Sequence, residues 1–229
     1  MTRSYSLLFA SISICFLSPL PCEAQAETSV TLKFLSFPSI DQPTPVELVV
    51  GEGKTIKVEI PTNELSAPYK VKSQAAWVLG ETVKGKDDKP AFTVFGQASA
   101  LTSNEQLILL IRKGKSNADG FEVIPINSIK TEFGGGKFLF VNASKVDIAG
   151  VIGTEKFVIK PGMHTIVHPK GDEKDKTLCQ AELYFKKDNE PRPFFSTTWP
   201  LSDAARALIF FYHDPESKRL RLHTIRDFL

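Results

Sequence analysis

The stretch Phe133-Gly134-Gly135-Gly136-Lys137-Phe138-Leu139 divides the sequence near its middle. Its three glycines form the only glycine run of the 229-residue chain. We interpret residues 134–136 as a linker, because consecutive glycines are typical of a boundary between domains. The segment Lys137-Phe138-Leu139 repeats Lys33-Phe34-Leu35 of the first half. The sequence therefore predicts two copies of one unit, one before the glycine run and one after it.

Further matches between the halves keep the same order, at an offset of about 100 residues. The matched residues and segments are Val46, Gly53, Val58 and Pro61 with Val146, Gly153, Val158 and Pro161, Gln74-Ala75 with Gln180-Ala181, 89–92 with 192–195, Leu101-Thr102 with Leu201-Ser202, 107–111 with 207–211, and Ile126 with Ile225. Each match alone carries little weight. Their shared order favours an internal duplication.

Alternating residue types predict β-strands in each half. In Lys54-Thr55-Ile56-Lys57-Val58-Glu59-Ile60 apolar residues alternate with polar ones, and Arg219-Leu220-Arg221-Leu222 follows the same rule. A period of two places one face of a strand in water and the other in a core. With turn signals such as Asp87-Asp88-Lys89-Pro90, each half holds about seven short strands. We expect an all-β protein of two tandem homologous β-sandwich-like domains, with a small barrel as the alternative architecture.

Two apolar runs lack this alternation. Leu107-Ile108-Leu109-Leu110-Ile111 and Ala207-Leu208-Ile209-Phe210-Phe211 are rich in branched and aromatic residues, and a polar turn follows each. This composition favours buried strands over helices. Ser103-Asn104-Glu105-Gln106 and Ser202-Asp203-Ala204-Ala205, just before the runs, resemble helix starts. We therefore expect a short helical turn at each of these two positions.

The N-terminus has the order of a secretory signal peptide. Arg3 precedes an apolar centre over residues 7–17, and Ala24-Gln25-Ala26 supplies a cleavage site of small residues. The apolar centre is shorter than the roughly 20 residues that span a bilayer, which argues against a membrane anchor. A lipoprotein attached at Cys22 is the alternative. We predict a signal peptide over 1–26, a first β-domain over 27–133, a glycine linker over 134–136, a second β-domain over 137–229, and a secreted or periplasmic location.

Charge and cysteine content narrow the function further. Lys and Arg number 28 against 26 Asp and Glu, so the net charge of +2 gives no field for binding nucleic acid. After cleavage only Cys179 remains, so an intramolecular disulfide is excluded and packing must supply the stability. The same mature chain has no apolar segment long enough to anchor it in a membrane.

The sequence has no recognisable catalytic or cofactor motif. Gly53-Lys54-Thr55 and Gly114-Lys115-Ser116 imitate the end of a phosphate-binding loop but lack its upstream glycine, and we expect hairpin turns there. All four histidines lie in the second half. On one strand His164 and His168 would be ~13 Å apart, too far to share a metal ion. We therefore expect no cofactor and no metal site.

Three residues stand out as candidates for ligand binding. Trp199 precedes Pro200 at an expected strand end, where its ring could face solvent, whereas we expect most other aromatic rings to lie in the core. Arg219 and Arg221 belong to a basic stripe that either touches an anionic polymer or protects an edge strand. We expect a non-catalytic binding or structural module that contacts a protein or an envelope or extracellular polymer. The alternatives are a carbohydrate-binding module with exposed aromatic residues and an enzyme with a site between the domains.

Overall fold

The computed structural model describes residues 29–38, 46–85, 89–113, 117–171, 176–187, 190–214 and 217–229. These residues form sixteen β-strands and two single-turn helices, so the expected all-β class is confirmed. The expected signal peptide at 1–26 and the turn at 114–116 lie outside the described residues.

The first half forms two four-stranded sheets. Its strands are β1 (Ser29–Phe37), β2 (Val46–Gly51), β3 (Lys54–Val58), β4 (Tyr69–Lys72), β5 (Ala76–Lys84), β6 (Pro90–Ser99), β7 (Glu105–Arg112) and β8 (Phe121–Asn127). The strand order is β4-β1-β7-β8 in one sheet and β3-β2-β5-β6 in the other. A 3-10 helix, η2 (Asn117–Asp119), lies before β8.

The second half follows helix α1 (Lys130–Phe133) and repeats this strand order. Its strands are β9 (Phe138–Asn142), β10 (Ile148–Ile152), β11 (Glu155–Ile159), β12 (His164–Val167), β13 (Leu178–Lys187), β14 (Glu190–Pro200), β15 (Ala205–His213) and β16 (Leu220–Phe228). The two sheets have the orders β12-β9-β15-β16 and β11-β10-β13-β14. The described part of each half therefore has eight strands, one more than the expected seven.

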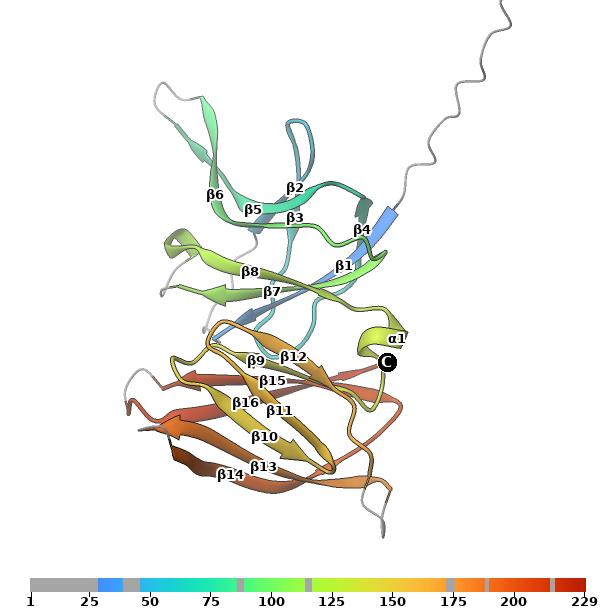
Figure 1. The fold of residues 1–229 in the computed structure, drawn as a ribbon. Coiled ribbons are helices and arrows are strands. Elements are labelled where there is room, and N and C mark those ends of the chain that lie inside the picture. The colour runs from blue at the N-terminus through green and yellow to red at the C-terminus, as the bar shows by residue number, and fades with distance from the viewer. Residues whose placement is uncertain are drawn as a thin grey trace, which may run out of the picture.

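The four sheets stack as four layers, with three apolar cores between them (Figure 1). One core lies inside the first half, around Trp77 and Phe34, and another inside the second half, around Phe140 and Phe211. The third core joins the two inner sheets, where the rings of Phe37 and Phe210 stack with centroids 4.7 Å apart. The halves are thus two sandwiches packed face to face.

This stacking explains the two apolar runs without alternation. Strands β7 and β15 lie inside the inner sheets, where they pair in parallel with β1 and β9. Both faces of an inner sheet are covered, so successive side chains enter different cores. Ile108 faces the core of the first half, for example, while Leu109 faces the core between the halves. The expected buried strands are confirmed.

The first expected helical turn is wrong, and the second position forms a single turn that does not continue as a helix. Strand β7 begins at Glu105, and the Gln106 side chain turns inward to accept a hydrogen bond from the Trp77 indole at 2.8 Å. Ser103 Oγ accepts from the Glu105 amide instead of capping a helix. At the second position a single hydrogen-bonded turn leads directly into β15. In both places pairing with the neighbouring strands prevails over the local capping pattern.

Several of the residue matches between the halves are out of register. Val58 is buried in the first core, whereas Val158 is 67% exposed, and Ile159 occupies the inward position in β11. Leu107 faces the core between the halves, whereas Ala207 faces the core of the second half. Lys33-Phe34-Leu35 and Lys137-Phe138-Leu139 do correspond in environment, because in both segments Phe faces its own sandwich and Leu faces the other half.

No helix within the described ranges is long and apolar enough to cross a bilayer.

Candidate functional site

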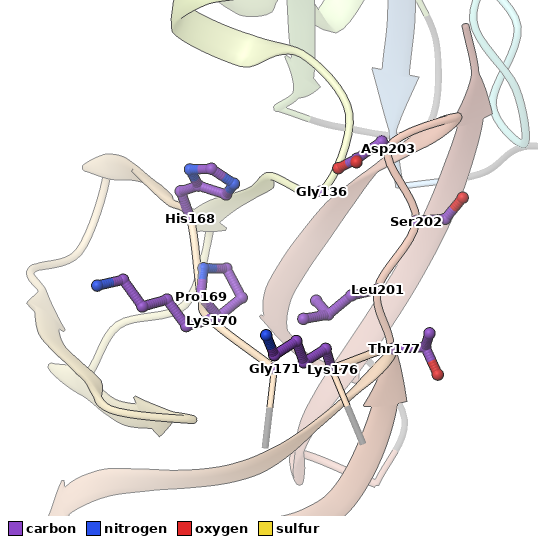
Figure 2. A pocket seen from close by; sticks show the side chains of 10 residues that line it. All are labelled: Gly136, His168, Pro169, Lys170, Gly171, Lys176, Thr177, Leu201, Ser202 and Asp203. Carbon is purple, nitrogen blue, oxygen red and sulfur yellow. The ribbon is translucent and has the colours of Figure 1, made fainter. Parts of the chain in front are cut away.

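A pocket of about 800 Å³ opens at one end of the second half. Three parts of the described chain form it: Gly136 before β9, residues 168–171 and 176–177 between β12 and β13, and residues 201–203 between β14 and β15 (Figure 2). Its lining residues are Gly136, His168, Pro169, Lys170, Gly171, Lys176, Thr177, Leu201, Ser202 and Asp203. A volume of this size lies in the range of small-molecule sites.

The glycine run shapes the wall of this pocket. A Cβ atom on Gly135 would lie 1.9 Å from the carbonyl oxygen of Asp203, so only glycine allows the two backbones to approach this closely. Gly136 is buried with a φ of +70°, and its amide donates to the carbonyl oxygens of Ser202 and Ala205, 2.9 Å away in each case. The run thus packs tightly against the β14–β15 connection.

The side chains of His168 and Asp203 both approach the position that a Cβ atom would have on Gly136. A Cβ atom there would lie 3.4 Å from Asp203 Oδ1 and 3.6 Å from His168 Nε2. Figure 2 shows the carboxylate of Asp203 directed toward Gly136, with the imidazole of His168 on the other side of the pocket. Both side chains are exposed to solvent. The pocket therefore offers an acidic acceptor and an imidazole to the same small volume.

The rest of the lining combines cations with apolar surface. Lys170 and Lys176 belong to the lining, with the Lys170 side chain directed away from Leu201 and Asp203 (Figure 2), and Leu201 supplies apolar surface. Ser202 does not join the group, because its hydroxyl points away from His168 (Figure 2) and its Oγ accepts the amide hydrogen of Ala204 at 3.2 Å. The described pocket therefore has no hydroxyl nucleophile held against the imidazole, as acyl transfer would require.

The mixed charge of the lining selects the chemistry of a ligand. A ligand that is only anionic is repelled by the Asp203 carboxylate. A ligand that is only cationic is repelled by the two lysines. A molecule with an acidic group beside free hydroxyls satisfies both, because its hydroxyls donate to Asp203 while its acid faces the ammonium groups. Hydroxy acids and acidic sugars have this pattern.

The residues singled out in the sequence lie elsewhere. Trp199 is half-buried, and its ring contacts Phe138 and Phe140 at centroid distances of 5.4 and 6.1 Å. Arg219 and Arg221 are exposed at the start of β16, the edge strand of its sheet. The structure thus places Trp199 against the core of the second half and the two arginines on a strand edge.

The other aromatic residues of the second half also serve packing. Phe210 and Phe211 are fully buried, and Phe194 and Phe195 are half-buried against the second core. Trp77 of the first half is fully buried as well. The named rings therefore take part in the three apolar cores.

The histidines do not gather into a metal centre in the part of the chain that the structure describes. No three His, Cys, Asp or Glu side chains there could hold one ion. Cys179 is buried in the second core, whereas Met163 is 58% exposed.

A second pocket, of about 300 Å³, lies where the two halves meet. Arg206 projects there and is held by its neighbours: it pairs with Asp227 at 2.8 Å, donates to Ser128 Oγ at 3.0 Å, and lies over the Phe133 ring at 4.6 Å. Lys33 adds a second cation 4.0 Å from Asp227. Because Arg206 is held by these partners from both halves, the arrangement stabilises the junction of the halves, and its guanidinium is not free to bind a ligand.

Sequence comparison adds no family to this description. No protein-family model matches the chain, and no curated protein is significantly similar to it.

Proposed function

We propose that the protein is a non-catalytic binding module that acts outside the cytoplasm, and that its pocket in the second half binds an acidic saccharide. The main observation behind this proposal is that His168 and Asp203 both approach the space beside Gly136, where any other residue would have its side chain. A sugar ring fits this surface, because its hydroxyls reach both polar groups and its carbon face covers Leu201.

The lysines of the lining specify the acidic group of this ligand. A carboxylate on the sugar pairs with Lys170 or Lys176, and such charge-assisted contacts are stronger than neutral ones. Neutral sugars leave both ammonium groups unpaired and therefore bind more weakly. Uronic acids, which carry a carboxylate on a hydroxylated ring, are the simplest sugars with this chemistry.

The two halves are, in this proposal, homologous domains that arose by duplication. Their identical strand orders support it, and so does a bulge at the same place in both, at Phe95 of β6 opposite Leu79 and Gly80, and at Phe194 of β14 opposite Leu183 and Tyr184. Duplication with later divergence accounts for a pocket that uses residues of the second half alone. The order of basic, apolar and small residues over 1–26 supports export from the cytoplasm.

Calorimetric titration of the full chain with galacturonate oligosaccharides tests the ligand. We expect binding of these sugars and none of the matched neutral galactose oligosaccharides. Asp203→Asn and Lys176→Ala are each expected to weaken binding by about ten-fold, the loss of one charged hydrogen bond. Lys156→Ala, an exposed lysine on β11 outside the pocket, is the matched control and leaves the affinity unchanged.

The same samples separate a binding module from an enzyme. Chromatography of the oligosaccharides after long incubation with the protein is expected to recover them intact. Shortened products that disappear with Asp203→Asn would assign a lytic or hydrolytic activity to the pocket and contradict a non-catalytic role. Equal affinity for acidic and neutral sugars would contradict the role given to the lysines.

A further inference from the structure

The four sheets end in eight edge strands within the described residues, and seven of them are protected against further pairing by short length, a bulge or a proline. Strands β3, β4, β11 and β12 have only four or five residues. Strands β6 and β14 carry a bulge each, and β14 also contains Pro191 and Pro193. Short length, bulges and prolines are the usual means by which an edge is kept from binding another strand.

Strand β8 is protected in two ways. Pro125 removes a backbone donor from it, and β6 lies against it, since a Cβ atom on Gly96 would be 2.9 Å from the Phe121 carbonyl oxygen. Its edge is therefore both interrupted and covered.

Strand β16 has none of these three features, and exposed charges are the one protective feature it carries. It has nine residues, contains no proline, and pairs with β15 without a break from Ala205 opposite Phe228 to His213 opposite Leu220. Its other side is the edge of the sheet in the described structure, so a regular row of backbone groups is available for one more strand. A strand of this length and regularity is a template for β-strand addition.

The charges along β16 select the kind of strand that can be added. Arg219, Arg221 and Arg226 are exposed, and Asp227 is engaged by Arg206 and Lys33. A second copy of this chain would bring two sets of arginines to one seam, where like charges repel. An acidic strand is attracted by the same arginines.

An exposed apolar group stands at the end of this edge. Phe228 is 74% exposed and the neighbouring Leu229 is 56% exposed. A partner that runs along β16 covers Phe228 if it carries an apolar residue at the corresponding end. The edge thus combines backbone groups, positive charge and an apolar anchor point.

From these observations we infer that β16 binds an extended acidic segment of a partner protein by β-strand addition. Arg221 lies opposite Tyr212, which faces the core between the halves, and Arg226 lies opposite Ala207, which faces the core of the second half. The two arginines are therefore on opposite faces of the strand. The partner accordingly needs acidic residues on both of its faces and an apolar residue near Phe228. This surface is separate from the saccharide pocket, so either proposal can fail alone.

Fluorescence anisotropy with the full chain tests the inference. The probe is a labelled peptide as long as β16, in which Glu is placed on both faces among Val and Thr and one end carries Phe. We expect saturable binding that weakens with salt and that protects β16 amides from hydrogen exchange. The same peptide methylated on alternate backbone nitrogens keeps its charge but loses its donors, and we expect it not to bind.

Protein variants give the matched comparison. Arg221→Glu with Arg226→Glu is expected to raise the Kd at least ten-fold, by about 1.4 kcal/mol or more. Lys54→Glu with Lys156→Glu changes the net charge equally at exposed lysines on β3 and β11, and is expected to leave the Kd within about two-fold.

Four results would overturn the inference. Equal binding of the methylated peptide would show attraction by charge alone. Binding of heparin without binding of the peptide would assign the arginines to a polyanion. Self-association that the arginine variants alter would assign the edge to a second copy. Absence of binding by the peptide and by heparin would show that the arginines only protect the edge.

Discussion

Arg206 shows how a single buried charge holds the two halves together. Its side chain is 4% exposed, and that of its partner Asp227 is 11% exposed. Removing Arg206 leaves the largely buried Asp227 with only the longer contact to Lys33, and losing one member of a buried pair costs more than the pair itself contributes. We therefore expect Arg206→Met to lower the free energy of unfolding by about 3 kcal/mol in urea denaturation. The double variant Arg206→Met with Asp227→Leu should recover most of this loss. A free energy of unfolding of Arg206→Met equal to that of the wild type would contradict the role of the pair.

From the burial of His223 we expect a pH dependence of stability. Its ring lies 5.8 Å from Phe37, its Nε2 atom is buried without a hydrogen-bond partner among the described residues, and burial lowers the pKa of this imidazole. An unfolded histidine has a pKa of about 6.5. Below that pH the unfolded state binds more protons, so the stability present above it is lost as the pH falls toward the folded pKa.

The measurement for His223 is the melting temperature as a function of pH. We expect the wild-type value to fall between about pH 7 and about pH 5, and His223→Phe to reduce that fall. Thr224→Val, a change at the next residue that does not titrate, should keep the wild-type slope. An unaltered slope in His223→Phe would show that other groups cause the pH dependence.

At the scale of elements, the sequence predicts strand type well and pairing register poorly. The non-alternating run 107–111 correctly indicates a strand buried on both faces, because a continuous run of apolar residues is typical of such strands. Register depends on partners in other segments, and a shift by one residue exchanges the faces of a strand. This is why Val158, matched by sequence with the buried Val58, lies on the outer surface.

The candidate pocket could not be predicted for the same reason. His168 follows β12 and Asp203 precedes β15, and nothing in their local sequence indicates that they meet at Gly136. The one available signal was the glycine run, which the sequence suggests as a linker. Its function in packing depends on the approach of residue 203, which only the folded chain shows.

Gly135 makes the packing function of the glycine run testable. We expect Gly135→Ala to destabilise the protein by about 1–3 kcal/mol, because the new Cβ atom overlaps the Asp203 carbonyl oxygen and the backbone must move. Gly51→Ala is the control, since a Cβ atom at Gly51 has no neighbour within 4 Å, and it should change the stability by less than about 0.5 kcal/mol. Chemical denaturation measures both. Equal stability of the two variants would show that the run acts as a loose linker.

At the scale of the molecule, we expect the core between the inner sheets to couple the unfolding of the two halves. Phe210 is fully buried in this core and stacks on Phe37 of the other half. Truncation of such a residue leaves a cavity that costs about 3–5 kcal/mol, and we expect Phe210→Ala to lose that amount. Because both inner sheets line the cavity, the first half should be weakened together with the second.

The two tryptophans allow each half to be followed separately, since Trp77 lies in the first core and Trp199 in the second. In Trp77→Phe and Trp199→Phe backgrounds, the remaining fluorescence reports one half alone. If the core between the halves couples them, Phe210→Ala shifts both urea transitions to lower concentration by the same free energy, whereas Val158→Ala on the outer surface shifts neither. A shift confined to the Trp199 signal would mean that each sandwich unfolds independently, and the inner sheets would then be neighbours without energetic coupling.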